Sequence, residues 1–409
     1  MLPDAWAGAF AVHEQSVAGQ GASYAGVAAG GALSSMFWNP ATITQQSGKS
    51  MENGFSGIIS KTSQGGVGGG GALTASDSNT AKNALVPSGY SSWQLNDRFW
   101  IGWGTNGAYG VAAKFPKTWA GAAYAQDSEM KSYNFNPVAA MKVTDWLSVG
   151  LGLQIQYMDI RFENFQGAAV SNLRLEGTGW GFGFTAGATF TPFRGTQIGI
   201  GYRSAIDQDL KGDMTGGIGL ATNGGIKATV KLPDVMTVGL RQRVGERATV
   251  MAGVEWTNWS RIGGVAVTQA NGAAALGPTG AAILLPFNYR DSFMVSIGAE
   301  CALRSDLTLR AGFAYESTPI PESVRTPRLP DSDRYWYSIG SSYRPPQFPG
   351  LVVDLAYTYI DVAATPITIT AASGNPWFSA AAGAYTGTAD SSSHIVSLAV
   401  RYQWGGPIW

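Results

Sequence analysis

The sequence predicts an all-β protein, a transmembrane antiparallel β-barrel of about 14 strands with an N-terminal hatch in its lumen. Beyond residue 49, apolar side chains alternate with polar or small ones at a two-residue period, as in strands with one apolar face. The predicted strands are joined by connections that are alternately short and long. Only 13% of the residues are charged, about half the usual share for soluble proteins, while 14 Trp, 16 Tyr and 17 Phe are present.

The N-terminal segment, residues 1–48, lacks this alternation and is the predicted hatch, a plug made of short helices. The barrel is predicted over residues 49–404, with a tail at 405–409. A lumen enclosed by about 14 strands is too wide for its own wall side chains to fill, so a plug is needed to block water. Asn39-Pro40 favours a helix start, because Asn is a preferred N-cap and Pro fits the first helical position. A helix cap with no further role explains this pair equally well.

The predicted strands each present one apolar face. In residues 147–157, for example, Leu147, Val149 and Leu151 alternate with Ser148 and Gly150. The predicted strands cover residues 50–61, 84–95, 98–110, 130–143, 146–163, 174–191, 195–210, 235–244, 247–259, 288–302, 306–316, 334–344, 350–361 and 392–404.

The connections between these strands indicate the topology. Tight turns are predicted at Asn96-Asp97, Thr144-Asp145, Pro192-Phe193-Arg194, Gly245-Glu246 and Arg304-Ser305. Long Gly-, Ala-, Ser- and Pro-rich loops are predicted at Thr62 to Asn83, Ile262 to Phe287 and Val362 to Ser391. Short periplasmic turns and long outer loops are typical of bacterial outer-membrane barrels. A soluble β-sandwich also alternates, but it does not explain this spacing.

The third predicted strand, Phe99 to Gly110, carries four glycines, which weaken strand pairing and favour a kink. Gly102 and Gly104 share one face and could simply make room for the hatch. Gly107 falls on the opposite register, which favours the other interpretation, a break in the barrel wall.

Composition and motifs argue against several other classes of protein. The formal net charge is zero and no block of like charges occurs, so we expect no nucleic-acid partner. The only histidines, His13 and His394, and the single Cys301 supply no metal-ligand cluster, so we expect no metal and no cofactor. The start, Met1-Leu2-Pro3-Asp4, lacks the basic and apolar regions of a signal peptide, which we therefore expect to be absent from this numbering.

Short motifs along the whole chain carry a family resemblance. They are Glu14-Gln15-Ser16, Asn39-Pro40-Ala41, Trp119-Ala120-Gly121, Leu232-Pro233-Asp234, the heptapeptide from Val254 to Ser260, Tyr289-Arg290-Asp291 and the heptapeptide from Pro330 to Trp336. In this order and at this spacing, the sequence resembles the FadL/TodX-type outer-membrane transporters of long-chain fatty acids and other hydrophobic compounds.

The resemblance implies a monomeric channel in the bacterial outer membrane, in contact with its lipid and lipopolysaccharide. An apolar groove and a deeper pocket would receive the cargo, which would diffuse passively and leave sideways into the bilayer through the kinked third strand. It assigns the hatch to the segments containing Glu14, Gln15, Ser16, Asn39, Pro40 and Ala41, and the lateral gate to Gly102, Gly104, Asn106 and Gly107.

Two residues are predicted to bind the cargo. The resemblance places Phe10, at the end of the hatch, against the deep pocket. Arg161 is the candidate cation for a fatty-acid carboxylate, although an ion pair with Asp159 or Glu163 explains it as well.

Other functions compete with fatty-acid uptake. The same route could carry monoaromatic hydrocarbons, which need no cation in the pocket. A barrel lipase would need a serine and a carboxylate beside His13 or His394, and the sequence places neither, so we expect no enzyme. A structural or adhesive barrel would use the long loops as a binding surface.

Overall fold

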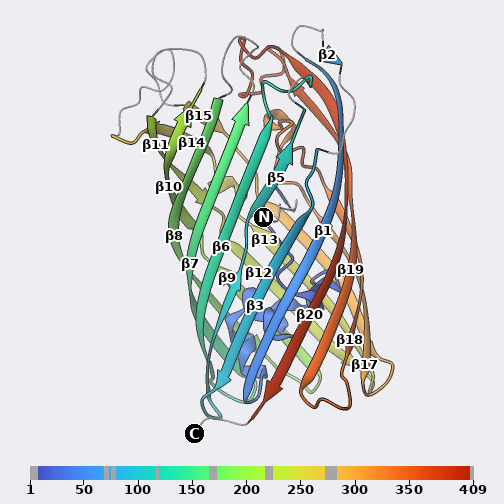
Figure 1. Cartoon of the computed structure of the whole chain (residues 1–409). Helices are drawn as coiled ribbons and strands as arrows, with labels where there is room; N and C mark the ends of the chain where they lie inside the picture. Colours follow the sequence, from blue (N-terminus) through green and yellow to red (C-terminus); the bar gives the residue numbers. More distant parts are fainter. Residues whose placement is uncertain are drawn as a thin grey trace.

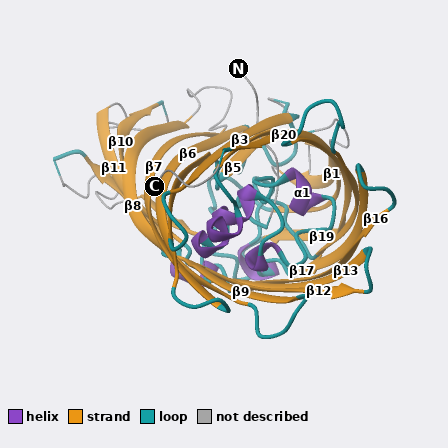
Figure 2. Cartoon of the chain, turned by 90° about the horizontal axis from the view of Figure 1, so that it is seen from below, coloured by secondary structure: helices purple, strands orange, loops and turns teal. Residues whose placement is uncertain are grey.

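The computed structural model describes residues 8–68, 73–74, 80–116, 119–164, 173–216, 224–271 and 283–405. Its strands wrap into a barrel around short helices in the lumen (Figure 1, Figure 2). The strands are β1 (Lys49–Gly68), β2 (Leu73–Thr74), β3 (Ala84–Gln94), β4 (Phe99–Asn106), β5 (Gly110–Lys114), β6 (Asp127–Lys142), β7 (Leu147–Asn164), β8 (Leu173–Phe190), β9 (Thr196–Arg203), β10 (Ile206–Thr215), β11 (Gly224–Leu232), β12 (Val235–Val244), β13 (Ala248–Thr257), β14 (Gly264–Gln269), β15 (Ile283–Pro286), β16 (Ser292–Ala302), β17 (Leu307–Glu316), β18 (Arg334–Tyr343), β19 (Leu351–Ile369) and β20 (Tyr385–Trp404). The helices are α1 (Val17–Gln20) and the 3-10 helices η1 (Val27–Ala29), η2 (Leu33–Phe37), η3 (Pro40–Gln45), η5 (Trp259–Arg261) and η6 (Glu322–Val324).

These segments form a closed antiparallel barrel of 14 strands, which confirms the predicted fold class. Several barrel strands consist of two segments in line, namely β4 with β5, β9 with β10, β12 with β11, β13 with β14 and β16 with β15. The first and last strands pair along their whole length, from Lys49 opposite Trp404 to Gly68 opposite Tyr385. This pairing leaves the barrel without an open edge.

The barrel wall is apolar outside and polar inside. Along β1, Phe55 and Ile59 are 51% and 53% exposed, whereas Ser56 and Ser60 are buried. A soluble protein would bury the aromatic and aliphatic side chains and expose the serines. The exposed apolar face therefore matches the hydrocarbon of a membrane, and the serines face the lumen.

All the predicted tight turns join consecutive strands, but the predicted long loops are partly strand. β1 continues to Gly68, β19 continues to Ile369 and β20 already begins at Tyr385, while β14 and β15 form a hairpin within residues 262–287. β11 was not predicted at all. These extensions include stretches in which Ser, Thr, Ala and Gly occur on both faces, so the side-chain alternation weakens although the backbone ladder continues.

The hatch fills the lumen near the end of the barrel that carries the C terminus (Figure 1). Its η3 helix begins as predicted: the Asn39 side chain accepts a hydrogen bond from Ala41 N at 3.0 Å, and Pro40 occupies the first turn. The Asn39 amide also donates to the carbonyl oxygens of Ala28, at 2.7 Å, and of Ala188 in β8, at 2.9 Å. One side chain thus caps a helix and fixes it to the wall. No helix among the described residues is long and apolar enough to cross a membrane.

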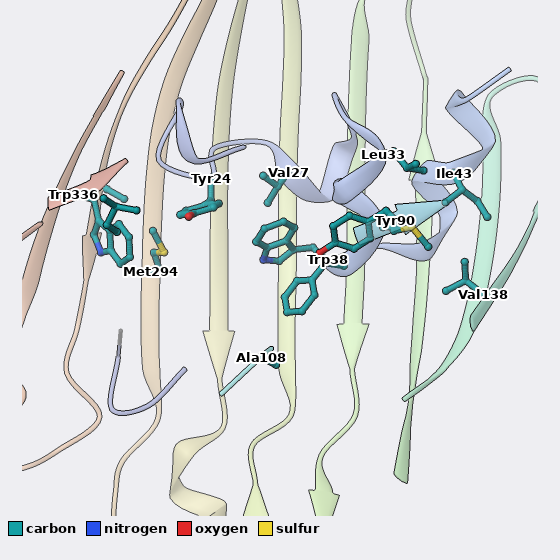
Figure 3. Close-up of a cluster of buried hydrophobic side chains, with 14 of the residues drawn as sticks. Tyr24, Val27, Leu33, Trp38, Ile43, Tyr90, Ala108, Val138, Met294 and Trp336 are labelled. Carbon is teal, nitrogen blue, oxygen red and sulfur yellow. The ribbon is translucent and has the colours of Figure 1, made fainter. Parts of the chain in front are cut away.

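Aromatic side chains join the hatch to the wall (Figure 3). The ring of Tyr24 lies 5.6 Å from that of Trp38 and 6.0 Å from that of Trp336, in β18. On the wall, Gly312 allows a close approach, because a Cβ there would collide with the backbone of Ala22. The small side chains of the hatch and the lumen-facing glycines therefore act together to bring the two backbones into contact.

Candidate functional site

A largely apolar cavity lies in the half of the barrel remote from the C terminus. It encloses about 810 Å3 of empty space, part of it open to the outside, within the roughly 300–1,000 Å3 typical of small-molecule sites. Its wall includes Val111 of β5, Met130 of β6, Ile160 of β7, Leu210 of β10 and Val265 of β14. These side chains belong to one buried cluster, so the cavity is built from the inward faces of neighbouring strands.

Phe10, a predicted cargo-binding residue, lies in the wall of this cavity and is buried. Its ring packs edge-on against Trp259, with 4.7 Å between ring centroids, and against Tyr109, at 6.0 Å. The hatch thus contributes an aromatic ring to the cavity from the side of the lumen.

Arg161, the other predicted cargo-binding residue, does not line the cavity. It lies on the opposite register from its neighbours Ile160 and Phe162, which do. Its guanidinium pairs with Glu129 at 2.6 Å and lies 3.8 Å from Asp127. Arg161 does form ion pairs, as the alternative explanation expected, but its partners are these two residues of β6 and not Asp159 or Glu163.

Arg328 is the arginine that lines the cavity. It lies in the loop between β17 and β18 and is 8% exposed. Its guanidinium donates to four oxygen atoms, all uncharged: the carbonyls of Tyr124 and Asp127, the Ser128 hydroxyl and the Asn164 side-chain amide. Among the described residues no carboxylate forms an ion pair with it. Burial lowers the pKa of Arg328 to about 10, so the guanidinium is still charged at neutral pH.

A second hollow lies in the barrel wall where the third strand breaks. It holds about 2040 Å3 of empty space, including open solvent at its mouth. Asn106 ends β4, Gly107 begins the break, and β5 starts only at Gly110; all three line this hollow. Gly102 and Gly104, by contrast, lie within the regular part of β4, where they pair with both β3 and β6.

Tyr109 lies between the cavity and the hollow in the wall. Its ring packs against Phe10 and Trp259 on the cavity side, while the same residue lines the wall hollow. Its hydroxyl lies 3.4 Å from the carbonyl oxygen of Pro233. Nothing in the sequence distinguishes this position except that it is an aromatic residue in a glycine-rich segment.

The hatch is hydrogen-bonded to the broken strand. Val12 N donates to Ala108 O and Gly110 N donates to Phe10 O, both at 2.9 Å. The Gln15 side-chain amide donates to Gly107 O at 2.7 Å. The break in the third strand leaves backbone N–H and C=O groups without a strand partner, and the hatch supplies their hydrogen bonds.

The remaining hatch motif residues have separate roles. The Ser16 side chain caps α1 by accepting a hydrogen bond from Gly19 N at 3.0 Å. Glu14 is buried, and one of its carboxylate oxygens has no hydrogen-bond partner among the described residues. Burial raises the pKa of Glu14 to about 7, although the charge of His13 opposes the rise.

The histidines lie in two unrelated environments. His13 Nε2 is 3.0 Å from Glu255 Oε1 inside the lumen, and His394 Nδ1 is 2.8 Å from the Tyr357 hydroxyl on the exposed face. Neither histidine forms a hydrogen bond with a serine within the described residues. In the same part of the chain, no group of His, Cys, Asp and Glu side chains could hold a metal ion.

Comparisons with known proteins agree with this architecture. A sequence model of the family described as outer membrane protein transport protein (OMPP1/FadL/TodX) matches residues 3–404. The long-chain fatty acid transport protein of Escherichia coli K12 is 26% identical over 388 residues, which is 83% of this chain and 85% of that protein. Outer membrane protein P1 of Haemophilus influenzae is 26% identical over 322 residues, covering 70% of this chain and 68% of that protein.

Solved structures share the fold. A Pseudomonas aeruginosa FadL homologue superposes with a TM-score of 0.86 at 22% identity, covering 97% of this chain and 100% of that chain. A Pseudomonas putida toluene transporter, TodX, superposes with a TM-score of 0.67 at 17% identity, covering 96% of this chain and 99% of that chain.

Proposed function

The chain belongs to the OMPP1/FadL/TodX family of outer-membrane transport proteins, and from this premise we propose that it takes up long-chain fatty acids by passive diffusion. The observation that carries the choice of cargo is Arg328, a buried guanidinium in the wall of an otherwise largely apolar cavity. The relatives named for fatty-acid transport support the same choice.

A fatty acid has the two chemical features that this cavity can bind. Its chain gains about 0.8 kcal/mol for each methylene removed from water, and the apolar wall supplies that environment. Its carboxylate would provide Arg328 with the anionic partner that the described residues do not. A hydrogen bond to a charged group contributes about 1.5–3 kcal/mol, so the carboxylate would raise affinity roughly tenfold to a hundredfold over an uncharged analogue.

The route in would pass the outer loops. A small hollow shares Phe287, Arg328 and Leu329 with the cavity and extends to Trp377, whose ring lies 5.7 Å from that of Phe287. A cargo molecule moving along this route would meet aromatic surfaces first and the guanidinium afterwards.

The route out would pass Tyr109 and leave through the wall hollow at Gly107. The outer lining of that hollow includes Phe135, Tyr157 and Trp180, which offer an apolar surface level with the barrel wall. A cargo that leaves sideways stays out of the polar lumen below, so its methylenes are not rehydrated.

The test compares oleate with toluene in binding to the purified protein and in uptake by vesicles. In Arg328→Gln, oleate affinity should fall roughly tenfold to a hundredfold, whereas toluene binding should not change. Arg325→Gln is the matched control, because Arg325 is a buried arginine of the same loop that bonds Pro366 O at 2.9 Å and does not line the cavity.

Four results would contradict this assignment. Unchanged oleate binding in Arg328→Gln, or equal loss of both ligands, would remove the carboxylate role. A selective loss of oleate in Arg161→Gln would transfer that role to Arg161. If Arg328→Gln does not fold, wild-type protein can be compared with oleate and oleyl alcohol, and equal affinities would favour hydrocarbon as the cargo.

A further inference from the structure

Arginines gather in a hollow at the end of the barrel that carries the short turns. The hollow lies between the β8–β9, β12–β13 and β16–β17 turns and holds about 1340 Å3 of empty space, including open solvent. Its charged lining is Arg194, Arg243, Arg247, Arg304 and Glu246. The strands that carry these turns follow one another along one side of the rim (Figure 2).

Backbone hydrogen bonds hold the three turns together. Arg243 N donates to Gly195 O, and Ala302 N donates to Arg247 O, both at 2.8 Å. Gly195 has φ of +88°, and a Cβ there would lie 3.1 Å from the Cβ of Arg243. The arginines are therefore carried by a fixed frame instead of three independent loops.

Most of the positive charge in the hollow has no counter-charge among the residues that the structure describes. Arg304 forms a bidentate pair with Asp306, at 3.0 and 3.1 Å. Arg243 donates to the backbone oxygen of Glu246 at 3.0 Å, which is an uncharged acceptor. Arg194, Arg243 and Arg247 form no ion pair with any described carboxylate, so Glu246 alone opposes three guanidinium groups in the hollow.

Apolar side chains on the same turns are exposed. Phe193 is 74% exposed, Val244 is 52% exposed and Leu303 is 50% exposed. Val244 and Leu303 share the register of the outward-facing residues of β12 and β16. A cationic hollow directly beside an apolar outer surface matches a molecule with an anionic head and hydrocarbon chains.

We infer that this hollow binds the phosphate of an anionic phospholipid from the periplasmic leaflet, with its acyl chains along Val244 and Leu303. Short turns of outer-membrane barrels face the periplasm, where the leaflet consists of phospholipids. Guanidinium groups bind phosphate oxygens through paired N–H donors, and they interact most strongly with headgroups of net negative charge. An acidic soluble partner would fit the arginines, but it would not explain the exposed apolar residues.

The experiment titrates purified full-length protein in detergent micelles with phosphatidylglycerol or phosphatidylethanolamine of identical chains, and native mass spectrometry counts the bound lipid. Wild type should prefer phosphatidylglycerol. Each arginine near an anionic surface is worth about fivefold in affinity, so the Arg243→Gln/Arg247→Gln double variant should lose about 25-fold for this lipid. Arg98→Gln, on the β3–β4 turn of the same rim and outside the hollow, is the matched control.

Two further arms separate the headgroup from the chains. Val244→Ser/Leu303→Ser should weaken both lipids alike, and glycerol phosphate without chains should bind far more weakly than the lipid.

The proposal would be overturned if wild type bound the two lipids equally, or if the double variant kept the full preference for phosphatidylglycerol. Tighter binding of a poly-glutamate peptide than of phosphatidylglycerol would overturn it in favour of an acidic protein partner. If the double variant fails to fold, Arg194→Gln, which changes one exposed turn residue, must still show about a fivefold loss.

Discussion

Raising the pH above about 8 is predicted to loosen the hatch, because a charged contact joins the hatch to the wall. His13 Nε2 lies 3.0 Å from Glu255 Oε1. The other oxygen of Glu255 accepts hydrogen bonds from Trp38 Nε1 of the hatch, at 3.1 Å, and from the Thr237 hydroxyl of β12, at 3.0 Å. One carboxylate therefore holds two hatch side chains against two strands.

The size of the effect follows from the pKa of His13. Burial lowers this pKa, but the charge of Glu316 and the hydrogen bond with Glu255 outweigh burial and raise the pKa from 6.5 to about 9. A raised histidine pKa means that the contact contributes its full stability below about pH 6.5 and loses it as the pH rises through about 9. At about 1.4 kcal/mol per tenfold change, the rise corresponds to roughly 3 kcal/mol, or on the order of a hundredfold in the docking equilibrium.

The assay is ion conductance through single barrels in planar bilayers, which reports a displaced hatch directly. Measurements run from about pH 7.5 to about 10, because Glu14, whose pKa burial raises to about 7, then stays mostly ionised and contributes little. About one pH unit of the stabilisation is already lost at about pH 7.5, so opening events should become about thirtyfold more frequent in wild type between there and about pH 10. Glu255→Gln should show more frequent openings at the starting pH and a smaller further change than wild type, because only the charge of Glu316 then raises the pKa of His13 appreciably.

His394→Gln is the matched control, because it removes the only other histidine, which lies on the exposed face beside Tyr357. This variant should reproduce the wild-type pH profile. The reasoning is refuted if wild type stays closed at both pH values, or if Glu255→Gln keeps the wild-type profile.

The other predictions concern the contacts that hold the hatch to the wall and the proposed exit through the wall hollow. Asn39→Ala should destabilise the hatch by about 1–3 kcal/mol, because a helix cap is lost and two buried backbone carbonyls lose their hydrogen-bond donor. Limited proteolysis of the hatch measures this loss. A variant that resists the protease as well as wild type does would contradict it. Gly312→Val should displace the hatch at Ala22 and cost about 1–3 kcal/mol, seen as a lower unfolding temperature of the hatch with the barrel intact. Tyr109→Ala should shorten the residence time of bound oleate by joining the cavity to the wall hollow; an unchanged dissociation rate would argue against a barrier at this ring. Gly107→Val should slow uptake without weakening binding, and normal uptake would argue against exit at the break.

The part of the fold that crosses the membrane could be predicted because the bilayer imposes a strict pattern. Every second residue of a wall strand must be apolar, so β7 and β16 are visible directly in the sequence. The Asn39-Pro40 helix start was visible for a different reason, since helix capping depends on adjacent residues only. The strand extensions beyond the membrane were missed because water no longer requires an apolar outer face there.

The cavity could be predicted only in part, because its residues meet across long distances in the sequence. Arg328 bonds residues 164 to 204 positions away, on β6, β7 and the segment before β6. No local pattern distinguishes it from Arg325, which is also buried in the same loop but does not line the cavity. Arg161 was the more visible candidate because it lies in a regular strand, yet its register turns it away from the cavity.

The contact between the hatch and the broken strand indicates that the conformation of each depends on the other. The backbone groups of residues 107–110 are held by Phe10, Val12 and Gln15. If the hatch left, three hydrogen bonds would be lost, and each buried group left unpaired would cost about 1–3 kcal/mol. The break would then have to close into a regular strand or fill with water. The shape of the break in the wall is therefore set by the hatch as well as by Gly107, and a change in the hatch should alter the proposed exit and the plug together.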